Sequence, residues 1–225
     1  MKLTNGNKTS KPPELREVCA QNCHQPPVMD LSRINSYKQM FMQYARTECP
    51  GFTVQPELRE TINDIFRWCM MLEGRLDPDK GLWLYGNIGT GKSTILRIVK
   101  QFCKVVRPRC QDGWPYSFAI FNAVDICSVF AGKGFDGLKE FVDSDRLAID
   151  ELGSETIPTG HYGTPLNVIQ HLLQSRYDKR HRSFTHVTTN LSIEQIADIY
   201  TPRIYDRCKE MFNFVEFTGR TLRKQ

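Results

Sequence analysis

Residues 86–93 read Gly-Asn-Ile-Gly-Thr-Gly-Lys-Ser, and this stretch decides the fold predicted for the chain. It matches the pattern G-x-x-x-x-G-K-[ST] of phosphate-binding loops. Its glycines let the backbone turn tightly, so that N–H groups point inward at an anion. In this pattern the lysine supplies a positive charge to the phosphates, and the last hydroxyl supplies a ligand for Mg²⁺. The sequence therefore predicts a nucleotide site made by Gly86, Asn87, Ile88, Gly89, Thr90, Gly91, Lys92, Ser93 and Thr94.

The segments on either side of this loop fit the same interpretation. Residues 81–85 are short and apolar, as a buried parallel strand should be. Residues 93–105 keep their apolar side chains on one broad helical face. A helix that begins at the loop adds the positive end of its dipole to the phosphate site. A chance glycine-rich turn is the alternative, and the order of strand, loop and helix argues against it.

Composition sets the broad class. The chain has 225 residues and a formal net charge of +5, which suits one α/β domain with a short extension. The positive charge permits binding to nucleic acid but does not show it. No apolar run reaches membrane-spanning length and residues 1–11 are polar, so we expect a cytoplasmic protein that binds no membrane. Its cysteines are expected to be reduced; Cys19 and Cys23 have the spacing of half a zinc site, but no second pair completes it.

Alternating strands and helices predict the architecture. Further strands are expected at 117–121, 146–151, 184–189 and 212–217, with helices between them, including a long helix opened by Thr164 and Pro165. We predict a three-layer α/β/α domain with a parallel five-stranded sheet over residues 51–225. Residues 1–50 form an N-terminal extension that could bind a partner. A helix near 31–46 within it either packs on the domain or serves as a docking surface. Residues 156–163 are expected to form a long loop, with His161 on its surface.

Polar groups at the ends of later strands are candidates for catalysis. Asp150 and Glu151 end a buried strand, where one carboxylate can reach Mg²⁺ and the other can orient the attacking water. Asn190 ends the next strand and can hydrogen-bond that water, although such a residue is more often a helix cap. Arg203 and Arg207 lie one turn apart and can supply positive charge to a transferred phosphoryl group. Two surface arginines are the alternative.

The order of these motifs over roughly residues 50–225 resembles the AAA+ ATPases of the DnaC/DnaI helicase-loader and IstB group. The resemblance implies a P-loop NTPase core without a C-terminal helical lid. It implies that Asp150 and Glu151 are the Walker B pair, with Ser93 and Asp150 holding Mg²⁺. Lys92, Glu151 and Asn190, the last at the sensor 1 position, would act on ATP. Arg207, with Arg203 one turn earlier, would be the arginine finger given in trans by a neighbouring protomer.

The same resemblance implies a function. The chain would bind and hydrolyse ATP, bind single-stranded DNA and load a replicative helicase. DNA contacts would come from about residues 130–139, where Lys133 and Lys139 are basic and where Phe130 and Phe135 could stack on bases. An IstB-like transposition helper would instead bind duplex DNA and a transposase. An ATP-gated adaptor with little turnover is a further alternative, and a P-loop kinase is disfavoured because no arginine-rich lid segment follows the loop.

Overall fold

The computed structural model describes residues 30–107, 116–180 and 183–221. Cys19 and Cys23 lie outside these residues. The helices of the described part are η1 Leu31–Arg33, α2 Ile34–Glu48, η2 Pro56–Leu58, α3 Arg59–Cys69, α4 Lys92–Val106, α5 Ala123–Asp143, α6 Val168–Asp178, α7 Ile193–Tyr200 and α8 Pro202–Met211. The strands are β1 Gly81–Gly86, β2 Ala119–Asn122, β3 Arg146–Leu152, β4 Thr159–His161, β5 Thr164–Leu166, β6 Phe184–Thr189 and β7 Phe212–Phe217. No helix in these ranges is long and apolar enough to span a bilayer.

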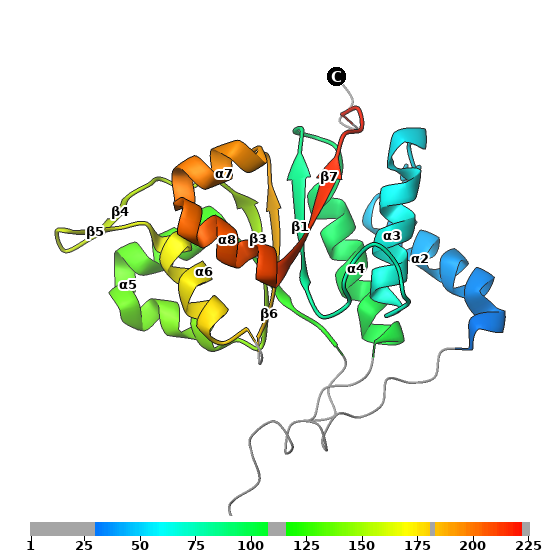
Figure 1. The fold of residues 1–225 in the computed structure, drawn as a ribbon, viewed down its shortest axis with the longest axis horizontal. Coiled ribbons are helices and arrows are strands. Elements are labelled where there is room, and N and C mark those ends of the chain that lie inside the picture. Colours follow the sequence, from blue (N-terminus) through cyan, green and yellow to red (C-terminus); the bar gives the residue numbers. More distant parts are fainter. Residues whose placement is uncertain (1–29, 108–115, 181–182, 222–225) are drawn as a thin grey trace, which may run out of the picture.

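Five strands form a parallel sheet in the order β2-β3-β6-β1-β7. Figure 1 shows α2, α3 and α4 on one side of this sheet and α5, α6 and α8 on the other. The predicted three-layer fold with a parallel five-stranded sheet is therefore confirmed. Strand β6 lies between β1 and β3. This strand, which Asn190 directly follows, thus separates the strand of the phosphate-binding loop from the strand of the acidic pair.

The sheet is buried on both faces because its strands alternate between two hydrophobic clusters. Leu82 and Leu84 of β1 pack with α3 and α4, whereas Trp83 packs with α5, α6 and α8. Successive side chains of a strand point to opposite faces, so one apolar run can fill both cores. Ala148 and Ile149 of β3 divide in the same way. The polar residues that follow these runs are left at the carboxyl edge of the sheet, where the strands end.

One predicted helix start is wrong. Thr164 does not cap a helix; it opens β5, which pairs antiparallel with β4 to form a hairpin in place of the expected long loop. The turn consists of Tyr162 and Gly163, whose φ angles are 44° and 82°. Two positive φ angles give the turn a twist that matches antiparallel strands. Helix α6 begins at Val168, and the Asn167 side chain caps it.

Two further helices bear on the predictions. Helix α2 packs against α4, and its Phe41 ring lies edge-on to the rings of Phe66 and Phe102 at 5.8 and 5.2 Å between centres. This part of the extension therefore shares the domain core, while the division of the chain near residue 50 stays a prediction. Helix α5 kinks at Gly134, whose φ of 61° and ψ of −149° are not helical. The kink divides α5 into two helical segments, one on either side of Gly134.

Candidate nucleotide site

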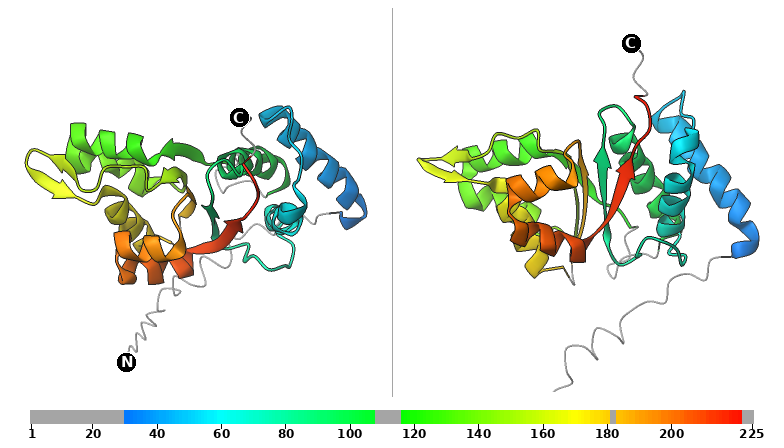
Figure 2. Two further views of the ribbon diagram at one scale, coloured as in Figure 1. Left: turned by 90° about the horizontal axis from the view of Figure 1, so that it is seen from above. Right: turned by 45° about the horizontal axis from the view of Figure 1, so that its top comes forward.

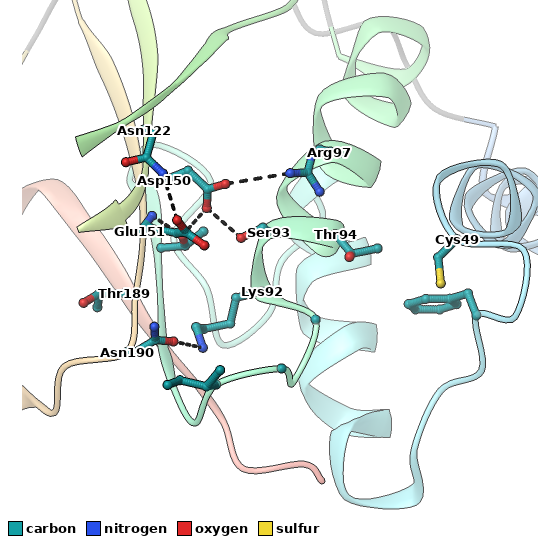
Figure 3. A pocket seen from close by; sticks show the side chains of 15 residues that line it. Cys49, Lys92, Ser93, Thr94, Arg97, Asn122, Asp150, Glu151, Thr189 and Asn190 are labelled. Carbon is teal, nitrogen blue, oxygen red and sulfur yellow. Dashed lines mark hydrogen bonds and ion pairs between the residues drawn. The ribbon is translucent and has the colours of Figure 1, made fainter. Parts of the chain in front are cut away.

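A cleft of about 460 Å³ lies at the carboxyl edge of the sheet (Figure 3). Residues from the ends of several strands meet there with the start of α4. This follows from the topology, because the carboxyl ends of parallel strands share one edge. The lining residues are Cys49, Phe52, Ile88, Gly89, Gly91, Lys92, Ser93, Thr94, Arg97, Asn122, Asp150, Glu151, Thr188, Thr189 and Asn190. The cleft thus unites most of the predicted loop with Asp150, Glu151 and Asn190.

The loop has the backbone that its glycines predict. Gly86, Gly89 and Gly91 have φ angles of 126°, 81° and 95°. At Gly86 a side chain is excluded for two reasons: the φ angle is positive, and an added Cβ would lie 2.5 Å from the carbonyl oxygen of Phe217. The Thr90 hydroxyl donates to the carbonyl oxygen of Asn87 at 2.9 Å and closes the turn. Helix α4 then begins at the lysine of the motif, with its N-terminus toward the cleft.

The Lys92 ammonium is buried and fully engaged in hydrogen bonds. Its Nζ donates to the carbonyl oxygens of Gly86 at 2.8 Å and Asn87 at 2.7 Å. It also donates to Oδ1 of Asn190 at 2.8 Å, so the loop is joined to the end of β6. A buried charge needs such partners because desolvation without them is costly. Asn190 therefore acts as a ligand of the lysine rather than as a helix cap; the cap of α7 is Ser192, which forms a capping box with Gln195.

Asp150 lies directly beside the serine of the loop. Ser93 Oγ donates to Asp150 Oδ1 at 2.7 Å, and the Thr188 hydroxyl donates to the same oxygen. Arg97 Nη2 lies 3.9 Å from the other carboxylate oxygen, Oδ2. A hydroxyl and a carboxylate oxygen at this separation fit the hard-oxygen coordination that Mg²⁺ prefers. The donor set that the sequence predicts for the metal is therefore present in this cleft.

Glu151 faces the same cleft because β3 is irregular at this point. Neighbouring residues of a regular strand point to opposite faces. Here the register shifts between Ile149 and Leu152, and Glu151 has a φ of 57°. A left-handed conformation costs a residue with a side chain on the order of 1–3 kcal/mol. Hydrogen bonds hold it: the Glu151 amide donates to the Thr188 hydroxyl at 3.0 Å, and Ser154 donates to the Glu151 carbonyl.

The Glu151 carboxylate has a partner that sequence reasoning missed. Asn122 Nδ2 donates to Glu151 Oε2 at 2.8 Å, and its Oδ1 caps α5 by accepting from the Val124 amide. Asn122 is the last residue of β2 and pairs in register with Asp150. A polar residue that ends a strand beside the acidic strand was the available signal. Arg97 and Thr188 were missed as well, the latter because an isolated threonine within a strand is ordinary.

A second wall of the cleft lies opposite the carboxylates. Cys49 and Phe52 come from the connection between α2 and α3, and Figure 3 shows Cys49 across the cleft from Glu151. Phe52 belongs to the hydrophobic core of α3 and α4, so this wall is fixed in place. An aromatic wall on one side and carboxylates on the other give the cleft an apolar end and a polar end. Sequence reasoning did not identify the apolar end.

The two predicted finger arginines lie elsewhere, on α8. Of the residues described, those that line the cleft include neither Arg203 nor Arg207. Arg203 is exposed and lines a separate groove between α6 and α8. The Arg207 guanidinium lies over the Tyr177 ring, 4.7 Å from its centre. Its Nη1 is buried without a hydrogen-bond partner in the part of the chain that the structure describes.

The expected DNA segment is only partly accessible. Phe130 is fully buried among α5, α6 and β3, so the prediction that it could stack on bases is wrong. The kink at Gly134 turns the chain, and Phe135 beyond it is exposed. Lys133 is exposed, and Lys139 pairs with Asp136 at 2.7 Å.

Among the described ranges no group of three or more His, Cys, Asp or Glu side chains could hold a metal ion.

The sequence matches no protein-family model and no curated protein. Solved structures do share the fold. The crystal structure of DnaI is 21% identical over 80% of this chain and 93% of that chain, with a TM-score of 0.56. The DnaC helicase loader is 19% identical over 76% and 96% of the two chains, with a TM-score of 0.55. Replication initiator DnaA bound to AMPPCP and single-stranded DNA is 16% identical over 76% and 49%, with a TM-score of 0.50. The resemblance to the DnaC/DnaI group is thus confirmed at the level of the fold.

Proposed function

We propose that this protein binds and hydrolyses ATP and acts on DNA as a DnaC-like loader of a replicative helicase that binds single-stranded DNA. One observation carries the proposal: Lys92, the Ser93–Asp150 pair and Glu151 meet around a single cleft. The fold supports it, since the DnaC helicase loader shares that fold and DnaA with the same fold holds AMPPCP and single-stranded DNA. The geometry of the cleft supports the following proposed roles for its residues.

Binding of the triphosphate rests on the loop. The carbonyl oxygens of Gly86 and Asn87 accept from the Lys92 ammonium, and phosphate oxygens would take their place. A charge-assisted bond to phosphate is stronger than one to a neutral carbonyl, so the exchange favours binding. Ser93 and Asp150 would hold Mg²⁺, which neutralises charge on the phosphates when bound. The base would lie toward Cys49 and Phe52, at the apolar end of the cleft.

Hydrolysis rests on Glu151. Its carboxylate would orient the attacking water and accept its proton, a task that requires a free carboxylate oxygen. Asn122 holds one of these oxygens, Oε2, at 2.8 Å, so release from Asn122 would leave both oxygens available to the water. Asn190 bonds the Lys92 ammonium, so it would respond when phosphate draws that ammonium away. The side-chain amides of Asn122 and Asn190 would thus connect phosphate binding in the cleft to Glu151 and Lys92.

The positive charge for the transition state would come from a second copy of the chain. Arg203 and Arg207 lie outside their own cleft, and Arg203 is exposed on α8, where a second copy could meet it. An arginine supplied in trans accelerates phosphoryl transfer by roughly 10³–10⁵. Self-association would then be part of catalysis. Mixing an Arg203→Ala, Arg207→Ala double variant with a Glu151→Gln variant should restore activity, because each supplies what the other lacks.

The test is the ATP hydrolysis rate over a range of protein concentrations, without DNA, with single-stranded DNA and with duplex DNA of equal length. We expect a rate that rises more than linearly with concentration, rises further with single-stranded DNA, and is lost in Lys92→Ala. Stronger stimulation by duplex DNA would favour a transposition helper. A flat, low rate with tight ATP binding would favour an adaptor. Phosphate transfer to a nucleoside would contradict the proposal.

A further inference from the structure

Helix α4 carries an arginine into the nucleotide cleft in addition to the residues of the phosphate-binding loop. Arg97 lines the cleft, and its Nη2 lies 3.9 Å from Asp150 Oδ2. Four positions separate Arg97 from Ser93, so both side chains leave α4 on the same face, one turn apart. Figure 3 shows the two side chains reaching the Asp150 carboxylate together. The loop motif ends at Ser93 and requires no cation at position 97, so Arg97 is a feature of this chain rather than of the motif.

The backbone that carries Arg97 is fixed. Figure 2 shows α4 beside the sheet, with α2 and α3 on its outer side. Ile95, Leu96 and Ile98 are buried in the core that α3, α4 and β1 share. Because these neighbours hold the helix in place, a rearrangement at Arg97 would involve its side chain alone.

The two oxygens of the Asp150 carboxylate have different partners. Oδ1 accepts from the hydroxyls of Ser93 and Thr188, whereas Oδ2 faces the Arg97 guanidinium. The Asp150 side chain is 12% exposed, so its negative charge is largely removed from water and requires compensation. Arg97 supplies this compensation as long as no metal ion lies beside Asp150.

The contact between Arg97 and Asp150 is also weak enough to be exchanged. A separation of 3.9 Å is beyond the reach of a hydrogen bond. The Arg97 side chain is 50% exposed, and within residues 30–107, 116–180 and 183–221 its guanidinium makes no hydrogen bond. An ion pair of this kind contributes little, because water solvates the exposed arginine almost as well. Arg97 can therefore release Oδ2 to another cation.

The formal charges of the cleft show what Arg97 contributes to it. Of the described residues, the charged ones that line the cleft are two cations, Lys92 and Arg97, and two carboxylates, Asp150 and Glu151. Their charges cancel, so a triphosphate meets a surface with no net charge. Without Arg97 the cleft would be negative, and it would then attract a divalent cation and repel phosphate.

The chain itself offers few ligands to a divalent cation. In the part that the structure describes, no three His, Cys, Asp or Glu side chains gather to hold a metal ion, and Ser93 and Asp150 are the donors placed together here. Mg²⁺ held by one carboxylate takes its other ligands from substrate phosphates and water. A cation beside Asp150 therefore weakens binding of the metal alone, and the negative charge of the phosphates overcomes this opposition.

We propose that Arg97 is a positioning residue that takes the place of the metal: it neutralises Asp150 while no metal is bound and releases Oδ2 when Mg²⁺ enters with ATP. The cleft thereby selects a divalent cation that accompanies nucleotide over a free one. The inference rests on the proposed function, because it concerns the metal that Ser93 and Asp150 hold in that function.

Two titrations of the full chain test the inference, and their expected changes have opposite signs. Mn²⁺ binding without nucleotide is followed by the electron paramagnetic resonance signal of the free ion, and ATP binding without metal by isothermal titration in EDTA. Arg97→Gln removes the charge and keeps a polar side chain. It should bind Mn²⁺ at least about threefold more tightly and metal-free ATP at least about threefold more weakly.

Two further variants are controls for charge. Arg97→Lys keeps the charge, and the contact is not bidentate, so both affinities should stay within about twofold of wild type. Lys104→Gln removes an exposed cation from the same helix, where Lys104 bonds Gln101 and no group of the cleft. It should behave as wild type does in both titrations.

The outcomes separate this inference from the proposed function. Equal Mn²⁺ affinities in wild type and Arg97→Gln, or no binding by either, would overturn the inference. Weaker Mn²⁺ binding in Arg97→Gln would overturn it too, since Arg97 would then orient Asp150 for the metal. A change in only one titration, the same changes in Lys104→Gln, or the same changes in Arg97→Lys would contradict charge compensation at Asp150. Hydrolysis of ATP with Mg²⁺ that is lost in Lys92→Ala would survive each of these results, whereas a wild-type chain that binds no ATP with Mg²⁺ would overturn the proposed function as well.

Discussion

The two ends of the central sheet both bury a positive charge, but in different ways. At the carboxyl end, Lys92 bonds two loop carbonyls and Asn190 on the wall of an open cleft. At the amino end, Arg176 is 0% exposed and donates to Thr185 Oγ1 and to three backbone carbonyls from the end of α5 and the start of β6. Burial lowers the pKa of Arg176 to about 10. A phosphate can replace the partners of the lysine, but nothing can reach those of the arginine.

Burial of a charge is therefore not by itself a sign of function. The hydrogen-bond partners of the charge decide its role, because a phosphate can replace those of Lys92 whereas those of Arg176 are part of the folded core. His186 extends the contrast at the structural end: it is buried, and its Nδ1 accepts from the Leu82 amide at 3.2 Å. Substitutions at the carboxyl end should remove activity and spare the fold. Those at the amino end should lower the stability of the fold.

The largest effect is expected from Lys92→Ala. Loss of the phosphate charge should reduce the rate of ATP hydrolysis on the order of 10³-fold or more. The melting temperature without nucleotide should change little, because the variant removes the buried charge together with the free-energy cost of taking that charge out of water. Steady-state phosphate release and thermal unfolding measure the two quantities. Unfolding of the variant at room temperature would show that Lys92, like Arg176, is needed for the fold, and would contradict the difference drawn between the two ends of the sheet.

Arg176→Met should lower the stability of the fold, whereas Lys92→Ala should lower activity and leave stability nearly unchanged. It leaves one buried carbonyl, two part-buried carbonyls and a buried hydroxyl without their donor, and an unsatisfied buried group costs about 1–3 kcal/mol. We expect the free energy of unfolding to fall by about 3 kcal/mol or more, measured by urea denaturation. Arg176→Lys keeps the charge but not the planar fork, and should lie between the variant and wild type. Stability equal to wild type in Arg176→Met would contradict the structural role.

Glu151→Gln tests the carboxylate within the functional end. A glutamine keeps the size of the side chain but cannot accept a proton, so hydrolysis should fall about 10²-fold or more. ATP binding should stay within a few-fold, because Glu151 is separate from the Lys92 network. Isothermal titration with ATP gives the affinity, and phosphate release gives the rate. Hydrolysis at the wild-type rate would remove Glu151 from the mechanism.

The pH dependence of stability tests His186. Burial, with the nearby charges of Arg107 and Arg176, lowers the pKa of His186 from 6.5 to about 3. Between these values the unfolded chain binds more protons than the folded chain, so stability is complete above pH 6.5 and declines as the pH falls. From pH 7 to pH 5 this residue should account for about 2 kcal/mol of lost stability. Urea denaturation of His186→Gln at both pH values should show a decline smaller by that amount. Identical pH dependence in the variant would show that His186 is not buried as a neutral group.

The smallest effect is expected at Asn122. Asn122→Ala frees the Glu151 carboxylate, so hydrolysis without DNA should rise, by up to about tenfold for one hydrogen bond to a charged group. The helix cap on α5 is lost as well, at about 1 kcal/mol of stability. Asn122→Asp is the control, since it keeps the cap and repels Glu151. A rate lowered by Asn122→Ala would mean that Asn122 positions Glu151 for catalysis instead of restraining it.

Local signals made most of the fold predictable. The loop, the buried strands and the capping box at Ser192 are each written in fewer than ten consecutive residues, and the structure has them in place. The hairpin was not predictable, because Thr164 followed by proline fits a helix start as well as a strand. Tertiary packing of His161 against the kinked helix decides between them.

Within the cleft too, residues with a local sequence signal were predictable, and residues whose contacts depend on the folded sheet were not. Lys92, Asp150 and Glu151 were identified as candidates because their residue types follow a known spacing, and their roles stay predictions. Asn122 was missed because its contact with Glu151 joins residues 29 positions apart, on two strands whose pairing only the folded sheet defines. Phe130 was taken as accessible because no local signal marks the kink at Gly134, and in the folded chain Phe130 is buried before the kink and Phe135 is exposed after it.

Strand β6 touches both halves of the cleft although it carries neither the loop nor an acidic group. Thr188 bonds Asp150, and Asn190 bonds Lys92. Sliding β6 by one residue, about 3.3 Å, would break both contacts at once. At its other end, the Thr185 hydroxyl accepts from Arg176 and fixes the same register. The register that aligns the cleft residues is thus also fixed at a contact remote from the cleft, so we expect substitutions at Arg176 and Thr185 to change the geometry of the cleft as well as the stability of the fold.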